Sequence, residues 1–210
     1  MAGVMGSKAL GIVRNGAIAL IGVLAILWLG VWLGFFDGAR EPGGNPNFGM
    51  VSVKPFHLID HMGRAVDERS MLGRPAAVFF GFTHCPDVCP TTLTSLSAAM
   101  ARLGTAADRI GVFFVTVDPA RDTPEALKDY LSPFDPRISG LTGAPDQIAS
   151  LAKSLGVYHA RMELEGGGYT MDHTASIFLL DAQGRFAGTI AYGEDGDAAL
   201  AKLRTLARGP

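Results

Sequence analysis

Residues 76–103 read AAVFFGFTHCPDVCPTTLTSLSAAMARL, and the expected fold is built outward from them. The first part of this stretch, residues 76–82, is a continuous apolar run, which is typical of a central strand buried on both faces of a sheet. Residues 90–103 carry apolar side chains at helical spacing. These apolar positions are Leu93, Leu96, Met100 and Leu103. The stretch therefore predicts a buried strand followed by a helix, with two cysteines at the turn between them.

The surrounding residues repeat this alternation of strands and helices. Residues 55–72 predict a hairpin or an extended lead-in, and residues 110–117 predict a second buried strand. Thr123 followed by Pro124 predicts the start of a helix, because a capping hydroxyl precedes a proline at the first helical position. Further predicted elements are a helix at 147–155, a hairpin of 157–162 with 169–171, strands at 176–181 and 185–191, and a helix at 197–207. This order predicts an α/β fold of the thioredoxin type.

Cys85 and Cys89 are the two cysteines of the sequence. A disulfide between them would close a very short loop and add little stability, so reactivity explains them better than cross-linking. At a turn into a helix, free backbone N–H groups and the helix dipole stabilise a thiolate, and we expect lowered thiol pKa values there. Their i, i+4 spacing also predicts that both side chains share one helix face. Such a pair forms a disulfide or binds one soft metal ion, and two inert cysteines fit this turn poorly.

The C-x-x-x-C spacing favours metal binding over the usual redox motif, which is C-x-x-C. Soft thiolates select Cu(I), Zn(II) or iron–sulfur clusters. Zinc sites and clusters usually take four protein ligands, and the sequence contains no further cysteine. Two thiolates with one imidazole would suit copper in either oxidation state.

His173 is the histidine best placed to complete such a site. It lies in residues 171–174, which we expect to form a polar loop facing the N-terminus of the cysteine helix in a thioredoxin-like sheet. The residues alone leave ligation and a structural role both open for it. Strand alternation points His84 away from Cys85. Surface or core positions account for the other histidines, which are His57, His61 and His159.

The N-terminal residues predict a membrane anchor. Residues 15–36 contain no charged side chain, and about 20 apolar residues span a bilayer as a helix. Basic residues precede this run, so the positive-inside rule predicts that residues 1–14 are cytoplasmic. Residues 37–50, rich in Gly, Pro and Asn, predict a linker to a domain at 51–210. A cleaved signal peptide is the alternative, but its apolar region would be shorter, about 7–15 residues.

The charge pattern argues against nucleic acid as a partner. The formal net charge is −2, with 18 Lys and Arg against 20 Asp and Glu. The basic residues are scattered along the chain and form no stripe with interleaved aromatic residues.

Three stretches of the chain resemble the Sco/SenC family of copper chaperones. They are PFHLID with LGRPAAVFFGFTHCPDVCPTTL, then VFFVTVDPARDTPEALKDY, then YTMDHTASIFLLDAQGR, in family order over most of residues 51–191. The resemblance implies a thioredoxin-like fold that binds one copper ion, Cu(I) or Cu(II), through Cys85, Cys89 and His173. It also implies a single-pass protein of a bacterial inner membrane with its soluble domain in the periplasm. The implied partners are the copper-site subunit of cytochrome c oxidase and an upstream periplasmic copper donor.

Four functions are compatible with these residues. The first is a metallochaperone for the binuclear copper site of the oxidase. The second is a thiol–disulfide oxidoreductase that reduces the cysteines of that site, with attack by Cys85 and resolution by Cys89. A peroxidase is disfavoured, because peroxiredoxins usually have Thr three residues before the reactive Cys, whereas Thr83 precedes Cys85 by two. A copper or redox sensor would use the same three residues as the chaperone.

Roles are also expected for residues near the site. Asp172 either orients His173 or caps its loop, since carboxylates are common beside metal-ligating imidazoles. Asp87 fits a solvated surface position. We hypothesise that the glycines at 166–168 let residues 158–172 shift when metal binds.

Overall fold

The computed structural model describes residues 21, 22, 25, 28 and 52–209. The chain divides into two compact units, residues 1–45 and 46–210. Apart from four residues, the expected cytoplasmic segment, anchor and linker at 1–50 lie outside the described part, so they stay predictions. Among the described residues, no helix combines the length and the apolar character needed to cross a membrane.

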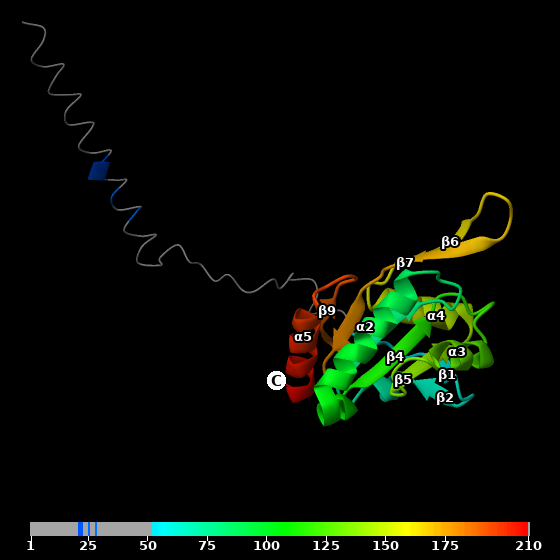
Figure 1. The fold of residues 1–210 in the computed structure, drawn as a ribbon, viewed down its shortest axis with the longest axis horizontal. Helices are drawn as coiled ribbons and strands as arrows, with labels where there is room; N and C mark the ends of the chain where they lie inside the picture. The colour runs from blue at the N-terminus through cyan, green and yellow to red at the C-terminus, as the bar shows by residue number, and fades with distance from the viewer. Residues whose placement is uncertain (1–20, 23–24, 26–27, 29–51, 210) are drawn as a thin grey trace, which may run out of the picture. The chain divides into compact units, whose positions relative to one another are not determined.

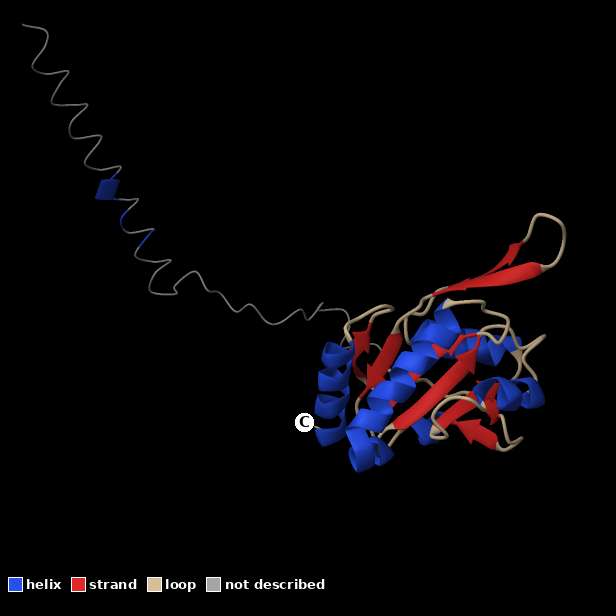
Figure 2. Ribbon diagram, in the orientation of Figure 1, coloured by secondary structure: helices blue, strands red, loops and turns tan. Residues whose placement is uncertain are grey.

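The second unit is built on a seven-stranded sheet with β3 (Ala76–Gly81) near its middle, and every residue of β3 is buried. β3 pairs in parallel with β4 (Gly111–Thr116) and antiparallel with β8 (Ile177–Leu180). The strand order is β2 (Ala65–Asp67), β1 (His57–Asp60), β5 (Ile138–Thr142), β4, β3, β8 and β9 (Phe186–Ile190). Figure 2 draws the strands in red. Strands buried on both faces explain the unbroken apolar runs of the sequence.

Helices follow the strands in alternation (Figure 1). The α-helices after β1 are α2 (Val88–Leu103), α3 (Pro124–Leu131), α4 (Pro145–Ser154) and α5 (Gly196–Arg208), with short 3₁₀ turns η2 (Glu68–Met71) and η3 (Gly104–Arg109). α2 packs against α5. α2 and α3 cover the same face of the sheet, because Phe114 of β4 contacts the Tyr130 ring of α3 and lies beside Cys89 of α2. The connections β3–α2–β4 and β4–α3–β5 step along the sheet in the same direction. Right-handed crossovers of this kind place both helices on one face.

A separate two-stranded hairpin carries the last part of the predicted site. Its strands are β6 (His159–Glu163) and β7 (Tyr169–His173), and Figure 1 shows them extending away from the main sheet. Gly166, Gly167 and Gly168 at its tip all have positive φ angles, of 95°, 97° and 80°, which glycine adopts without steric cost. The predicted hairpin is confirmed, but His173 is the last residue of β7 and does not lie in a loop.

The predicted strands and helices of residues 52–209 are confirmed with shifts of a few residues at their ends, and one strand was missed. β5 contains Ser139 and Gly140 and lacks a clear apolar alternation, so its sequence gave no strand signal. A Cβ on Gly140 would lie 2.6 Å from Leu131 Cδ1 and 3.3 Å from Leu127 Cβ. The glycine therefore lets α3 pack closely on the strand, which explains why a residue with low strand propensity occupies it.

The close packing of α3 on β5 predicts that Gly140→Ala destabilises the domain. The added methyl group overlaps the buried Leu131 side chain, and such overpacking costs about 1–3 kcal/mol. Urea unfolding followed by far-UV circular dichroism measures this loss. Gly196→Ala is the matched control, because no atom lies within 4 Å of its Cβ position at the start of α5. Equal unfolding midpoints for the two variants would contradict the packing argument.

Candidate metal centre

The cysteine segment turns sharply between β3 and α2. Cys85 lies in the turn, where its backbone N–H donates a hydrogen bond to Phe82 O at 3.2 Å. α2 begins at Val88 after the cap residue Asp87, so Cys89 lies in the first helical turn. The prediction that both cysteines share a helix face is therefore wrong, because Cys85 precedes the helix. Both thiols are free.

Burial sets the two thiols apart. Cys85 is half-buried, whereas Cys89 is fully buried. Burial raises the pKa of the Cys89 thiol well above its usual range, and the nearby Cys85 adds to the effect. The expected lowering is thus wrong for Cys89, because lost solvation of the thiolate outweighs the helix N-terminus. The Cys89 backbone N–H, in the first turn of the helix, donates a hydrogen bond to Cys85 Sγ at 3.4 Å.

His173 reaches the cysteines from the end of β7. Its Nε2 lies 3.6 Å from Cys89 Sγ, and its Nδ1 lies 3.1 Å from the backbone oxygen of Thr174. A carbonyl only accepts hydrogen bonds, so Nδ1 carries the proton and Nε2 presents its lone pair to the sulfur. The rings of Phe79 and Phe82 contact the imidazole edge-on at centroid distances of 6.1 and 5.9 Å.

Burial lowers the pKa of His173, although the hydrogen bond to Thr174 opposes the effect in part. The imidazole is therefore neutral near pH 7, as a metal ligand must be. Asp172 is exposed on the hairpin, and the ring is held by the Thr174 carbonyl. Asp172 was expected either to orient His173 or to cap its loop. The Thr174 carbonyl, and not Asp172, orients the imidazole.

The three predicted ligands meet at one point. The Sγ atoms of Cys85 and Cys89 and a ring nitrogen of His173 all lie within 4.8 Å of one another. This spacing lets one ion contact all three atoms, and within residues 52–209 the site lies at the junction of β3, α2 and β7. Two sulfurs and one neutral imidazole form a soft donor set, which suits copper better than Mg²⁺ or Ca²⁺.

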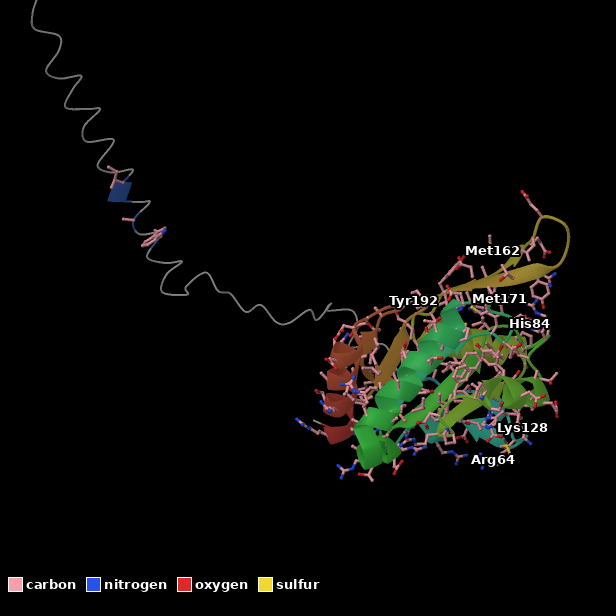
Figure 3. All side chains as sticks on the ribbon, viewed as in Figure 1. Arg64, His84, Lys128, Met162, Met171 and Tyr192 are labelled. Carbon is pink, nitrogen blue, oxygen red and sulfur yellow. The ribbon has the colours of Figure 1, made fainter. Side chains whose placement is uncertain are left out.

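The other histidines stay outside this cluster. His84, labelled in Figure 3, is exposed, with Nδ1 2.9 Å from Thr83 Oγ1 and 3.9 Å from Asp122 Oδ1. His61 differs from the surface role expected for it, because its Nδ1 accepts a hydrogen bond from the Gly140 N–H at 2.9 Å. His57 is exposed, and His159 lies directly opposite His173 across the hairpin. Asp87 is exposed as predicted.

Several residues to which sequence reasoning assigned no role contact the cysteine loop, the hairpin or each other, or lie near the cysteines. They are Thr83, Thr116, Asp118, Arg121, Asp122, Tyr130 and Tyr169. The Tyr130 hydroxyl is buried without a hydrogen-bond partner, and burial, followed by the charges of Cys89 and Cys85, raises its pKa. One signal for part of this group was available, since Asp118, Arg121 and Asp122 form a charged run directly after a buried strand.

Comparison with known proteins matches most of the chain to the family that its motifs resemble. The family model described as SCO1/SenC matches residues 45–208. Protein SCO2 of Saccharomyces cerevisiae mitochondria is 37% identical over 170 residues, which is 79% of this chain and 56% of the relative. The SCO2-like protein RC0895 of Rickettsia conorii is 38% identical over 172 residues, which is 80% of this chain and 82% of the relative. The chain spans about half the length of the yeast and Arabidopsis relatives that it matches.

Solved structures share the fold. Bradyrhizobium japonicum ScoI with copper bound is 44% identical with a TM-score of 0.69, covering 74% of this chain and 99% of that chain. Arabidopsis thaliana ScoI with copper bound is 34% identical with a TM-score of 0.66, and the match covers 72% of this chain and 98% of that chain. BsSco, described as a member of the Sco family of cytochrome c oxidase assembly proteins, covers 74% and 93% at 22% identity and a TM-score of 0.59, which shows the fold alone. The predicted thioredoxin-like α/β class is confirmed by these likenesses.

The difference in burial predicts unequal reactivity of the two thiols. The variant Cys89→Ser keeps only Cys85, and the variant Cys85→Ser keeps only Cys89. At about pH 8, Cys85 in the first variant should react with iodoacetamide at least about tenfold faster than Cys89 in the second. The reason is that Cys89 is both shielded and disfavoured as a thiolate. Mass spectrometry of the metal-free chain over time gives both rates. In denaturant the two variants should react alike, and equal rates in the folded state would contradict the assignment of the buried thiol.

Proposed function

The chain belongs to the SCO1/SenC family, and we propose that it is a metallochaperone that binds one copper ion through Cys85, Cys89 and His173. In this proposal it delivers the copper to the binuclear copper site of cytochrome c oxidase. The family resemblance and the copper-bound relatives support the choice of metal. The observation that carries it is the convergence of two sulfurs and one imidazole nitrogen within 4.8 Å.

The donor set supports tight but exchangeable binding. Thiolates and a neutral imidazole match the softness of Cu(I), and His173 is already in the tautomer that presents Nε2. Three ligands leave room for a fourth from a partner. Cys85 is the more exposed of the two cysteines, so an incoming thiolate or imidazole would approach from its side. The protein's ligands then leave one at a time, and the copper is cargo that passes to the acceptor.

The proposed location follows from the N-terminal residues. The uncharged run at residues 15–36 is long enough to anchor the chain in a bacterial inner membrane. The basic residues before it favour a cytoplasmic N-terminus and a periplasmic domain. There the domain would receive copper from an upstream periplasmic donor and meet the copper-site subunit of the oxidase.

A thiol–disulfide oxidoreductase is the second candidate, and the unequal thiols favour it. Cys85 is less buried than Cys89, and its sulfur accepts a hydrogen bond from the Cys89 N–H, so Cys85 is the better placed of the two to attack. It would attack a disulfide of the partner and release one partner thiolate. Cys89 would then attack the Cys85 sulfur, which releases the second partner thiol and leaves a Cys85–Cys89 disulfide. An external dithiol would have to restore the reduced pair.

Copper titration separates these functions. The reduced full chain in detergent micelles, without oxygen, should bind one Cu(I) per chain against a competing chelator. His173→Ala should weaken binding at least about tenfold, because it removes a ligand and not only a neighbour of one.

The matched control is His57→Ala, which removes an exposed imidazole on β1 outside the cluster and should leave the affinity unchanged. Weak binding that is indifferent to His173, together with rapid disulfide exchange by Cys85, would refute the chaperone and leave the reductase.

Copper affinity should also rise with pH. Burial raises the pKa of the Cys89 thiol, so the metal-free thiol is protonated at neutral pH and must release its proton when copper binds. The apparent affinity should therefore increase at least about tenfold per pH unit between about pH 6 and pH 8. His173→Ala should show lower affinity but the same slope between about pH 7 and pH 8, because burial lowers the pKa of His173 and the imidazole is neutral in that range. A flat profile in the wild-type chain would contradict the protonated thiol.

A further inference from the structure

The turn between β4 and α3, residues Asp118–Asp122, holds the cysteine loop through a buried carboxylate. Asp122 is fully buried. Its carboxylate accepts hydrogen bonds from the Thr83 N–H at 3.0 Å, from Thr83 Oγ1 at 2.6 Å and from Thr116 Oγ1 at 2.6 Å. Thr116 anchors the carboxylate to β4, while Thr83 lies two residues before Cys85. These three hydrogen bonds join the Thr83 segment to β4 through one buried carboxylate, so Asp122 fixes the start of the cysteine loop.

The same turn holds the hairpin through Arg121 and Asp118. Arg121 Nε pairs with the Asp118 carboxylate, and Arg121 Nη1 donates to Tyr169 O at 3.1 Å. The guanidinium carbon lies 3.8 Å from the centroid of the Tyr169 ring. The Tyr169 hydroxyl donates to Asp118 Oδ1 at 3.0 Å, so the pair contacts Tyr169 at its backbone, its ring and its hydroxyl. Tyr169 is the first residue of β7, and His173 is the last.

The hairpin needs such an anchor. β6 and β7 pair with each other and with no strand of the main sheet, and an isolated two-stranded hairpin is marginally stable in water. At its other end, Tyr158 and Thr174 exchange hydrogen bonds, which close the hairpin but do not tie it to the sheet. Met171 packs on the core between the two ends. Within the described residues, the polar contacts of Arg121 and Asp118 thus join β7 to the element that also holds the cysteine loop.

We propose that the Asp118–Asp122 turn positions the metal ligands, with Asp122 fixing the cysteine loop and Arg121 with Asp118 fixing β7, so that His173 stays in reach of the cysteine sulfurs. Arg121 and Asp118 are positioning residues, because they act on the metal through His173 and do not touch the ligand atoms. The part that concerns copper rests on the proposed function, whereas the part that concerns the order of β7 does not. Loss of Arg121 should therefore loosen the histidine and spare the cysteines.

Hydrogen exchange of the metal-free full chain in detergent tests the order of β7. Arg121→Gln should speed amide exchange of residues 159–163 and 169–173 at least about tenfold. The lost contacts stabilise the closed hairpin, so without them the hairpin opens locally more often. Exchange in β8 should not change. Arg137→Gln is the matched control, since Arg137 is a similarly half-buried arginine that pairs with Asp135 and Asp108, away from the hairpin. It should leave the hairpin amides unchanged.

A double-mutant cycle on Cu(I) affinity tests the action through His173. Arg121→Gln should weaken Cu(I) binding about 10–100-fold in the wild-type background, as loss of a group that orients a ligand does. In the His173→Ala background it should change the affinity less than about twofold, because the residue on which it acts is gone. A general loss of structure would instead weaken binding equally in both backgrounds.

The outcomes separate the two proposals. Unchanged hairpin exchange in Arg121→Gln overturns the positioning role whether or not copper binds, and so does an equal loss of affinity in both backgrounds. If the wild-type chain binds no copper, the proposed function fails while the exchange result still decides the role of the turn in ordering β7. If Arg121→Gln does not fold, Tyr169→Leu removes the ring and hydroxyl from the partly exposed hairpin and leaves the Arg121–Asp118 pair in place, with the same expected results.

Discussion

The close packing of the first turn of α2 on the end of β3 is the contact on which the site depends. A Cβ at Gly81 would lie 2.8 Å from Cys89 Sγ and 2.7 Å from the Phe114 ring. Since Gly81 has no side chain, the Cys89 sulfur lies fully buried against the strand. That burial makes the free thiolate unfavourable. A bound cation compensates the charge of the ionised sulfur, so burial couples the protonation of Cys89 to metal binding.

The second half of the site is arranged around this buried sulfur. His173 reaches it from a hairpin 84 residues further along the chain, with Nδ1 held by the Thr174 carbonyl and Nε2 facing the Cys89 sulfur. The Phe79 and Phe82 rings enclose the imidazole, while Cys85 stays half-exposed. The site is therefore more enclosed on the side of Cys89 than on the side of Cys85. Such asymmetry suits a group that must hold an ion and also pass it on, and it equally suits an attacking and a resolving thiol.

Much of the fold and the ligand set could be predicted from short-range patterns. Apolar runs at β3 and β4, the Thr123–Pro124 helix start and the glycine-rich hairpin tip each depend on neighbouring residues, so they are visible in the sequence. β5 was missed because its glycine reflects close contact with Leu131 of α3, which is a tertiary demand. The lowered pKa expected for both cysteines was wrong for Cys89, because the pattern showed the helix start and not the depth of burial.

The alternation of strands and helices, the cysteine pair at a strand-to-helix turn and the family resemblance that pointed to His173 could all be inferred from the residues alone. These features are local, or they follow from residue identity. Three further features depend on long-range packing. Cys85 lies before the helix, the Thr174 carbonyl and not Asp172 orients the imidazole, and the Asp118–Asp122 turn contacts both ligand-bearing segments. The physical reason is that hydrogen bonding and desolvation depend on which distant atoms fill the space around a group, and residue spacing along the chain does not specify those atoms.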